Sequence, residues 1–189
     1  MSAEGADRGR AHCFGARLAA SWGAGGALRC VAQSRDGPVA LIATRNRHME
    51  CTINWLPATG MAFSAETGSG HLLTMDGAPD GGGRNLAPRP MEMLLAGAGG
   101  CTAYDVVLIL KRGRHDVTGV QVKTSAERAP EDPKVFTRIN LHFVVTGRGL
   151  PAQAVERAIA LSHEKYCSAT IMLAKTAEIT TSHEVVEAS

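Results

Sequence analysis

One segment constrains the fold more than any other, the apolar run from Pro90 to about Arg112. A helix that is apolar on every side is buried at the centre of a fold, so we expect a central helix here. Lys111 and Arg112 suit its C-terminal end, where cations favour the macrodipole, and Gly113 is expected at C′. The apolar residues circle nearly the whole helix: Met91, Met93, Leu94, Leu95, Ala96, Ala98, Ala103, Val106, Val107, Ile109 and Leu110.

Short apolar runs separated by Gly and Pro predict strands on both sides of this helix. Before it, an antiparallel meander is expected over 52–56, 61–66 and 71–75, followed by a flexible Gly/Pro/Arg loop over 77–90. After it, strands are expected over 117–124 and 134–146. The second of these alternates Ile139, Leu141, Phe143 and Val145, which indicates a strand with one buried face.

The C-terminal part predicts two helices and a last strand. Pro151 suits position N1 of a helix that runs to about Tyr166, and Ser168 is expected to cap a short helix over 169–175. The first helix should bury Val155, Ala158, Ile159 and Ser162, and the strand should cover 177–186. This order, without βαβ repetition, predicts an α+β fold with helices packed on an antiparallel sheet.

Residues 1–48 differ from the rest of the chain. They are rich in Gly, Ala and Arg, show no sustained period, and carry seven Arg against three acids, Glu4, Asp7 and Asp36. We expect a disordered or non-native extension, with Met49 as the true start and 49–189 as one domain. An Arg-rich organellar transit peptide is the alternative, which Glu4 and Asp7 disfavour.

Charge and cysteine usage exclude several classes of protein. Residues 49–189 hold 13 basic and 15 acidic side chains, so no nucleic-acid footprint is expected. No apolar run approaches the roughly 18 consecutive residues of a membrane span, and no secretory segment opens the chain. The five Cys show no CxxC and no metal-ligand spacing, which predicts free thiols in a reducing cytoplasm without a metal or cofactor.

Two cysteines occupy special positions in the predicted elements. Cys101 lies within the apolar helix after Gly99 and Gly100, which would let another group approach closely. Cys167 lies at the junction of two helices, where a helix N-terminus can lower a thiol pKa, while Cys101 in mid-helix gets no such help. From these facts alone, a buried cysteine that acts only as a small hydrophobe is the favoured interpretation.

Three segments resemble the OsmC/Ohr family, especially its YhfA-type branch. PMEMLLAGAGGC (90–101) is similar to the first-cysteine helix, with Cys eleven positions after Pro, and EKYCSATIML (164–173) to the second-cysteine motif. The strand INLHFVVTG lies between them, and the resemblance runs from about Met49 to Val186.

The resemblance implies a fold, an assembly and an activity. The fold would be an antiparallel sheet wrapped around the central helix, in an intertwined homodimer with an apolar pocket at each site. Cys101 would attack an organic hydroperoxide and become a sulfenic acid, and Cys167 would resolve it as a disulfide. A dithiol such as dihydrolipoamide would then reduce the pair.

The chain departs from the family where the cysteine is activated. The peroxidase branches place a Glu directly after the Pro, where this chain has Met91, and Glu92 faces about half a turn away from Cys101. The peroxidase branches also use an Arg on an early strand to activate the cysteine, but the strands over 52–75 of this chain contain no Arg. Only Arg84 and Arg89 of the loop, or His71, could supply a cation near the thiol. Asp105 shares the face of Cys101, and its carboxylate would disfavour a thiolate.

Two functions therefore remain open from the sequence. One is a thiol-dependent hydroperoxide reductase with weak activity. The other is a non-catalytic dimeric binding protein of the same fold, which holds a small apolar or thiol ligand. The cysteine pair favours the first, and the missing Arg and Glu favour the second. His163 and Glu164 are expected to make ordinary surface contacts.

Overall fold

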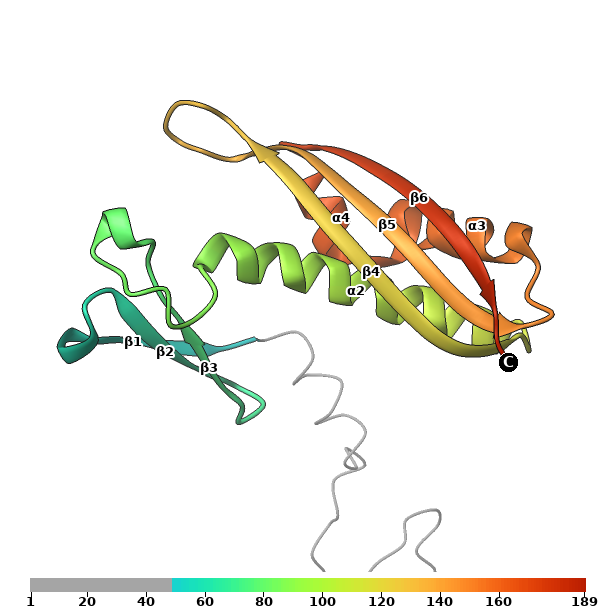
Figure 1. Cartoon of the computed structure of the whole chain (residues 1–189), viewed down its shortest axis with the longest axis horizontal. Coiled ribbons are helices and arrows are strands. Elements are labelled where there is room, and N and C mark those ends of the chain that lie inside the picture. The colour runs from blue at the N-terminus through green and yellow to red at the C-terminus, as the bar shows by residue number, and fades with distance from the viewer. Residues whose placement is uncertain (1–48) are drawn as a thin grey trace, which may run out of the picture. The chain divides into compact units, whose positions relative to one another are not determined.

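The computed structural model describes residues 49–189, which contain two three-stranded sheets and a 23-residue helix (Figure 1). The expectations for 1–48, including those for Cys13 and Cys30, lie outside the described residues. The first sheet contains β1 (Cys51–Leu56), β2 (Ala62–Thr67) and β3 (Leu72–Met75) in that order, with both pairs antiparallel. The predicted meander is therefore confirmed.

The loop between β3 and the long helix is organised around one carboxylate. Asp76 is buried by the loop itself and accepts backbone N–H bonds from Gly77, Arg84 and Leu86 at 2.7, 3.0 and 3.0 Å. These bonds, with that from Leu86 foremost, hold the pKa of Asp76 below its usual value. The loop that was expected to be flexible is thus held by three hydrogen bonds from its backbone to the Asp76 side chain. It also includes a 3-10 turn over Pro79–Gly81.

The long helix α2 spans Pro90–Arg112, as predicted from its apolar run. Only one side is buried, because strand β4 and helices α3 and α4 pack against that side. Leu94 and Tyr104 are 46% and 69% exposed, so the prediction of a helix buried on every side is wrong for the single chain. The buried residues of α2 are Ala98, Gly99, Thr102, Val106 and Leu110.

Helix α2 bears on two further expectations. By length and composition alone it could cross a membrane, although the core helix of a soluble protein passes the same test. At its end, Gly113 is the C-cap with a right-handed φ of −72°, and Arg114 takes the left-handed conformation with φ 62°. The expected left-handed role of Gly113 at C′ therefore falls to Arg114.

The second sheet is mixed rather than antiparallel. Strands β4 (Asp116–Arg128) and β5 (Phe136–Arg148) are antiparallel, whereas β5 and β6 (Glu178–Glu187) are parallel. The chain crosses from β5 to β6 through two helices and re-enters the sheet in the same direction, which is the usual route to a parallel pair. The predicted all-antiparallel sheet is wrong at β6 for this reason.

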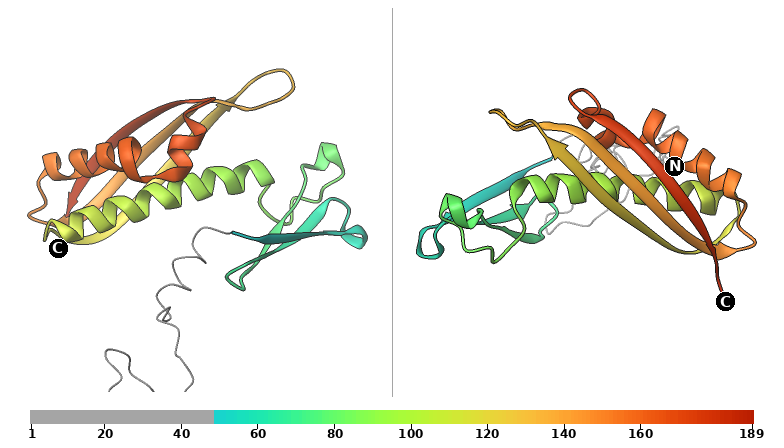
Figure 2. Two further views of the ribbon diagram at one scale, coloured as in Figure 1. Left: turned by 180° about the vertical axis from the view of Figure 1, so that it is seen from behind. Right: turned by 45° about the horizontal axis from the view of Figure 1, so that its top comes forward.

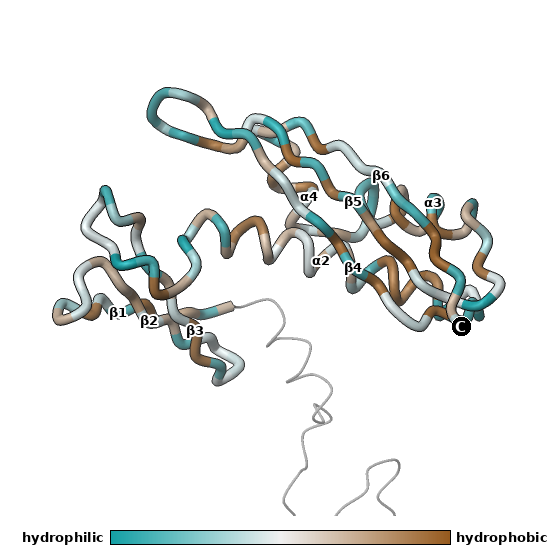
Figure 3. Tube along the Cα trace, viewed as in Figure 1, coloured by the Kyte–Doolittle hydropathy of each residue, from teal (hydrophilic) through white to brown (hydrophobic). Residues whose placement is uncertain are grey.

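The helices lie on one face of this sheet, as the view from behind shows (Figure 2). Helix α3 (Ala152–Leu161) begins after Pro151, which is its N-cap rather than N1, and α4 (Ser168–Leu173) follows. The buried positions predicted for β5 and α3 are confirmed. Figure 3 shows hydrophobic stretches in α2 and along the sheet. The core cluster is Val106, Leu110, Phe136, Ile139, Leu141, Phe143, Val145, Leu150, Val155, Ala158, Ile159 and Ala177.

Candidate thiol site

The second cysteine is positioned by an irregular turn. Helix α3 ends at Leu161, and a π-helical turn over Ser162–Tyr166 replaces the last turn of the predicted continuous helix. Cys167 then adopts an extended conformation at the N-cap of α4, and its N–H donates to the Ser162 carbonyl at 2.8 Å. Ser168, the predicted cap, is instead the first residue of α4. Single π turns inside helical segments often accompany functional sites.

The first cysteine is positioned by a close approach of α2 to the sheet. A Cβ added to Gly99 would lie 2.9 Å from Cγ2 of Thr124 in β4, so any larger residue would force Thr124 or the helix to shift. A Cβ on Gly100 would meet nothing within 4 Å, so the predicted effect of the Gly pair belongs to Gly99. Cys101 follows on the same helix and remains partly exposed.

The two sulfurs and one carboxylate form a cluster. Ligand atoms of Cys101, Asp105 and Cys167 all lie within 4.8 Å of one another, and both thiols are free. Cys167 is completely buried, whereas Cys101 is partly exposed. A disulfide has a sulfur–sulfur distance of about 2.05 Å, so modest side-chain movement could join the pair.

The surroundings of Cys101 favour its neutral thiol. Burial, together with the neighbouring Cys167 thiol and the Asp105 carboxylate, raises the pKa of Cys101 above its usual value. The backbone N–H of Ala169, in the first turn of α4, acts in the opposite direction. The helix N-terminus of α4 therefore acts on the Cys101 thiol. Among the described residues, no cation contributes to this pKa.

A hydrogen-bond chain that no sequence pattern predicted holds Asp105 in place. The Ser162 hydroxyl donates to Oδ2 of Asp105 at 3.0 Å, and Thr102 Oγ1 lies 2.9 Å from Ser162 Oγ. Since the single Ser162 proton goes to the carboxylate, Thr102 must donate to Ser162. Thr102 and Ser162 are fully buried, so the chain holds the carboxylate in place from the core side.

His163 is not the ordinary surface residue that was expected. Its ring packs edge-on against Phe143, with 6.3 Å between the ring centroids. Its Nε2 is buried and has no hydrogen-bond partner among residues 49–189. Burial lowers the pKa of His163, and the Asp105 charge only partly opposes this effect. His163 is therefore a neutral neighbour of the cluster at pH 7.

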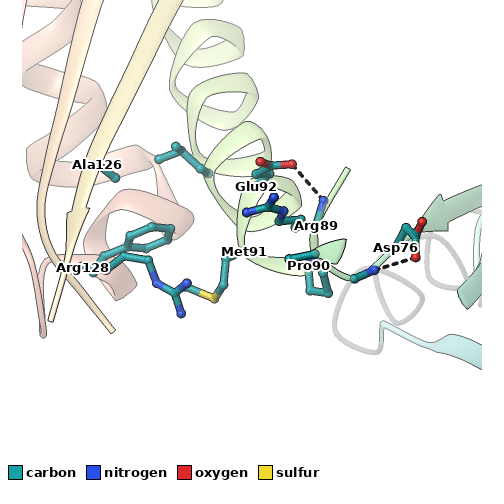
Figure 4. Close-up of a pocket in the computed structure, with 11 residues that line it drawn as sticks. Asp76, Arg89, Pro90, Met91, Glu92, Ala126 and Arg128 are labelled. Atoms are coloured by element: carbon teal, nitrogen blue, oxygen red, sulfur yellow. Dashed lines mark hydrogen bonds between the residues drawn. The ribbon is translucent and has the colours of Figure 1, made fainter. Parts of the chain in front are cut away.

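The loop cations belong to a different place. The backbone N–H of Arg84 donates to Asp76, and the Arg84 charge acts on that carboxylate. Arg89 lines a cavity of about 430 Å³ at the N-terminal end of α2. Figure 4 shows Arg128 near Met91 and Arg89 near Glu92 in this cavity, and Glu92 accepts the Arg89 N–H at 2.9 Å. Neither Cys101 nor Cys167 lines it. Ten residues of helix, about 15 Å, separate Met91 from Cys101.

A partly exposed thiol beside a buried one, held between a long helix and a short helix on a sheet, defines an α+β protein with a dithiol site. Residues 81–182 match the OsmC-like protein family, and the chain belongs to this family. The chain is 51% identical over 140 residues to Protein YhfA of Escherichia coli, which covers 74% of this chain and all of YhfA.

Solved structures share the fold. A protein of Aquifex aeolicus is 27% identical, with a TM-score of 0.65 over 75% of this chain and 98% of its own. The organic hydroperoxide resistance protein OsmC of Legionella pneumophila is 17% identical, with a TM-score of 0.57 over 72% and 96% of the two chains. The resemblance seen in the two cysteine motifs is thus confirmed at the level of the family.

Proposed function

We propose that this protein is a thiol-dependent hydroperoxide reductase in which Cys101 attacks the substrate and Cys167 resolves the product. The observation that carries the proposal is the partly exposed Cys101 thiol within 4.8 Å of the buried Cys167 thiol. The name of the Legionella relative, an organic hydroperoxide resistance protein, supports an organic hydroperoxide as substrate.

The reaction needs only the two thiols and an external dithiol. The Cys101 thiolate attacks the distal peroxide oxygen, the O–O bond breaks, and an alcohol leaves after taking up a proton. The Cys101 sulfenic acid condenses with the Cys167 thiol, which forms the disulfide and releases water. A dithiol then returns both cysteines to thiols and is itself oxidised to a disulfide. We propose a reducing cytoplasm as the compartment that supplies it.

The activity should be weak at neutral pH. The raised pKa of Cys101 leaves little thiolate, because burial and the Asp105 charge oppose ionisation and only the Ala169 N–H favours it. Stopped-flow oxidation of the reduced protein by cumene hydroperoxide measures this directly. A rate near the diffusion limit at neutral pH would contradict the proposed weak activity.

We also propose that two copies assemble into a homodimer. Ile53 and Trp55 of β1 and Leu72 of β3 are 54%, 56% and 71% exposed in the single chain. The outer side of α2, with Leu94 and Tyr104, is exposed as well. Apolar surface of this extent on one chain is typical of an interface, and a second copy would complete the burial that the α2 sequence predicts.

The alternative function is a binding protein without turnover, and one observation favours it. The cavity at the start of α2 is lined by apolar Met91, Leu95 and Phe136, and it lies away from the thiols. Its lining also contains two cations and two carboxylates, from Arg89, Arg128, Asp76 and Glu92. Such a cavity suits a small apolar ligand with a few polar groups. In that case the cysteines would have no catalytic role.

Intact-mass measurement distinguishes the two functions. The reduced protein is treated with one equivalent of cumene hydroperoxide, in a background in which Cys13, Cys30 and Cys51 are changed to Ser. The reductase predicts a loss of about 2 Da, as two thiols become a disulfide. Cys101→Ser should abolish the change, whereas Cys167→Ser should leave Cys101 oxidised without a disulfide. An unchanged mass would support the binding protein.

A further inference from the structure

The cluster at the thiol site has the composition of a metal site. Two cysteine sulfurs and a carboxylate oxygen, from Cys101, Cys167 and Asp105, lie within 4.8 Å of one another. Thiolate ligands select soft or borderline cations such as Zn²⁺, whereas Mg²⁺ and Ca²⁺ require sets of oxygen ligands. No sequence motif predicted such a site, because the two cysteines lie 66 positions apart in the chain.

The separations suit a tetrahedral ion. Zn–S bonds of about 2.3 Å place two sulfurs of a tetrahedron about 3.8 Å apart, and a carboxylate oxygen binds at about 2.0–2.2 Å. The observed separations of up to 4.8 Å therefore need a contraction of about 1 Å, within reach of side-chain rotation. Cys101 and Cys167 come from different helices, α2 and the start of α4, whose contact fixes the two backbones near each other.

The carboxylate already has the support that metal ligands require. The Ser162 hydroxyl donates to Oδ2 of Asp105 at 3.0 Å, and Thr102 Oγ1 lies 2.9 Å from Ser162 Oγ on the core side. Such outer hydrogen bonds orient a ligand and leave its remaining lone pairs for the ion. Ser162 and Thr102 are wholly buried, so this support is independent of solvent.

We propose that Cys101, Cys167 and Asp105 bind one Zn²⁺ ion per chain in the reduced protein, with solvent in a fourth position on the exposed Cys101 side. Binding releases two thiol protons and leaves both sulfurs as thiolates on the ion. The disulfide form cannot bind, because its sulfurs no longer carry charge. Zinc and hydroperoxide therefore compete for the same sulfurs, and a bound ion protects the pair from oxidation. The ligand set does not require the protein to be a reductase.

The test is a metal titration of the full chain with Cys13, Cys30 and Cys51 changed to Ser, reduced and kept free of oxygen. Co²⁺ serves as the spectroscopic probe, since thiolate–cobalt charge-transfer bands appear only when sulfur is a ligand. Zn²⁺ affinity is then measured by competition with a chromophoric chelator. We expect one ion per chain, displacement of Co²⁺ by Zn²⁺, and no binding of Mg²⁺.

The variants separate the ligands from their support. Cys101→Ser, Cys167→Ser and Asp105→Asn should each weaken binding by at least about a hundredfold, beyond the roughly 10–100-fold expected for Ser162→Ala. Ser64→Ala, in β2 and outside the cluster, is the matched control and should bind like the parent. Alkylation of the folded parent with N-ethylmaleimide should abolish the cobalt bands, which tests the site without any substitution.

Absence of thiolate–cobalt bands in the reduced parent would overturn the proposal, as would an Asp105→Asn variant that binds Zn²⁺ with unchanged affinity. The disulfide measurement above is made separately, in the presence of a chelator. A protein that forms the disulfide but binds no metal loses only the zinc site. A protein that binds zinc but forms no disulfide loses only the reductase.

Discussion

The two sheets of this chain differ in how they are stabilised. The β4–β6 sheet packs one face against α2 and α3 and buries four apolar side chains of β5 completely, Ile139, Leu141, Phe143 and Val145. The β1–β3 sheet has no comparable core, and three of its large apolar side chains, Ile53, Trp55 and Leu72, are more than half exposed. The β4–β6 sheet is therefore stabilised by its own core, whereas the β1–β3 sheet needs another surface to cover its exposed apolar side chains.

The thiol site lies entirely within the self-sufficient region. Cys101, Asp105, Ser162 and Cys167 come from α2, the π turn and α4, all on the helical side of the β4–β6 sheet. The reactivity of the thiol site should therefore depend on the core beneath these helices. The β1–β3 sheet should matter first for assembly.

The largest expected effect comes from removing part of that core. Phe143→Ala deletes a fully buried ring of β5 that also contacts His163, and should lower the free energy of unfolding by about 3–5 kcal/mol. Urea denaturation followed by circular dichroism measures the change. Val186→Ala, a partly exposed apolar residue of β6, is the control and should change it by less than about 1 kcal/mol. Equal losses of unfolding free energy in the two variants would contradict the conclusion that this core stabilises the β4–β6 sheet.

The next effect concerns pH and the thiol site. Because the pKa of Cys101 is raised, neutral thiol predominates at pH 7 and the thiolate fraction grows as pH rises. The rate of oxidation by cumene hydroperoxide should increase about tenfold per pH unit over the range below that pKa. Stopped-flow measurements of the oxidation rate at each pH test this, and the Cys51→Ser control should show the same pH dependence. A rate independent of pH between about 6 and 8 would show that Cys101 is already a thiolate.

A smaller effect is expected at the β1–β3 sheet. A charge at Trp55, in Trp55→Asp, should weaken the proposed dimer by at least about tenfold, since a charge would be buried in an apolar interface. Analytical ultracentrifugation of both proteins across a concentration series measures it, with Glu156→Gln, an exposed residue of α3, as the control outside the β1–β3 sheet. A parent chain that stays monomeric at high concentration would contradict the dimer.

A few-fold effect is expected from Asp105. Asp105→Asn removes a negative charge that raises the pKa of Cys101, so more thiolate should form and oxidation at neutral pH should accelerate, by up to about tenfold. The rate is measured with chelator present, so that metal binding does not contribute. A slower reaction would mean that the carboxylate instead accepts the thiol proton.

The smallest effect is expected in the loop before α2. The pKa of Asp76 is lowered, so its contribution to stability is present above the usual carboxyl pKa and is lost as the pH falls through the lowered value. Asp76→Asn should remove this acid-side dependence and slightly lower the melting temperature. Thermal melts across the acid range measure it, and an unchanged pH profile would show that the carboxylate does not hold the loop.

Local patterns predicted much of the fold. The bounds of α2 follow from its continuous apolar run, and the buried face of β5 follows from its period of two; a single segment carries both signals within itself. The parallel pairing of β6 did not follow, because it depends on where two helices place the returning chain. The exposed side of α2 did not follow either. An apolar residue indicates that a side chain is suited to burial, but not whether the same chain or a second copy covers it.

The site was predictable only in part. The two cysteine motifs identified Cys101 and Cys167, but nothing in the sequence linked Ser162 to Asp105, which are 57 residues apart. The π turn that places Cys167 also had no local signal, because the preceding apolar spacing continues as an ordinary helix. Contacts between distant residues, rather than propensities, therefore determine the chemistry of the cluster.

The most direct test of the account is the position of the disulfide after oxidation. The protein is treated with one equivalent of cumene hydroperoxide, alkylated and digested with trypsin without reduction. The account predicts that peptide 85–111, which contains Cys101, is joined to peptide 166–175, which contains Cys167, and that the chain remains single on a non-reducing gel. Both peptides recovered separately with alkylated cysteines, or a link through Cys51, would contradict it.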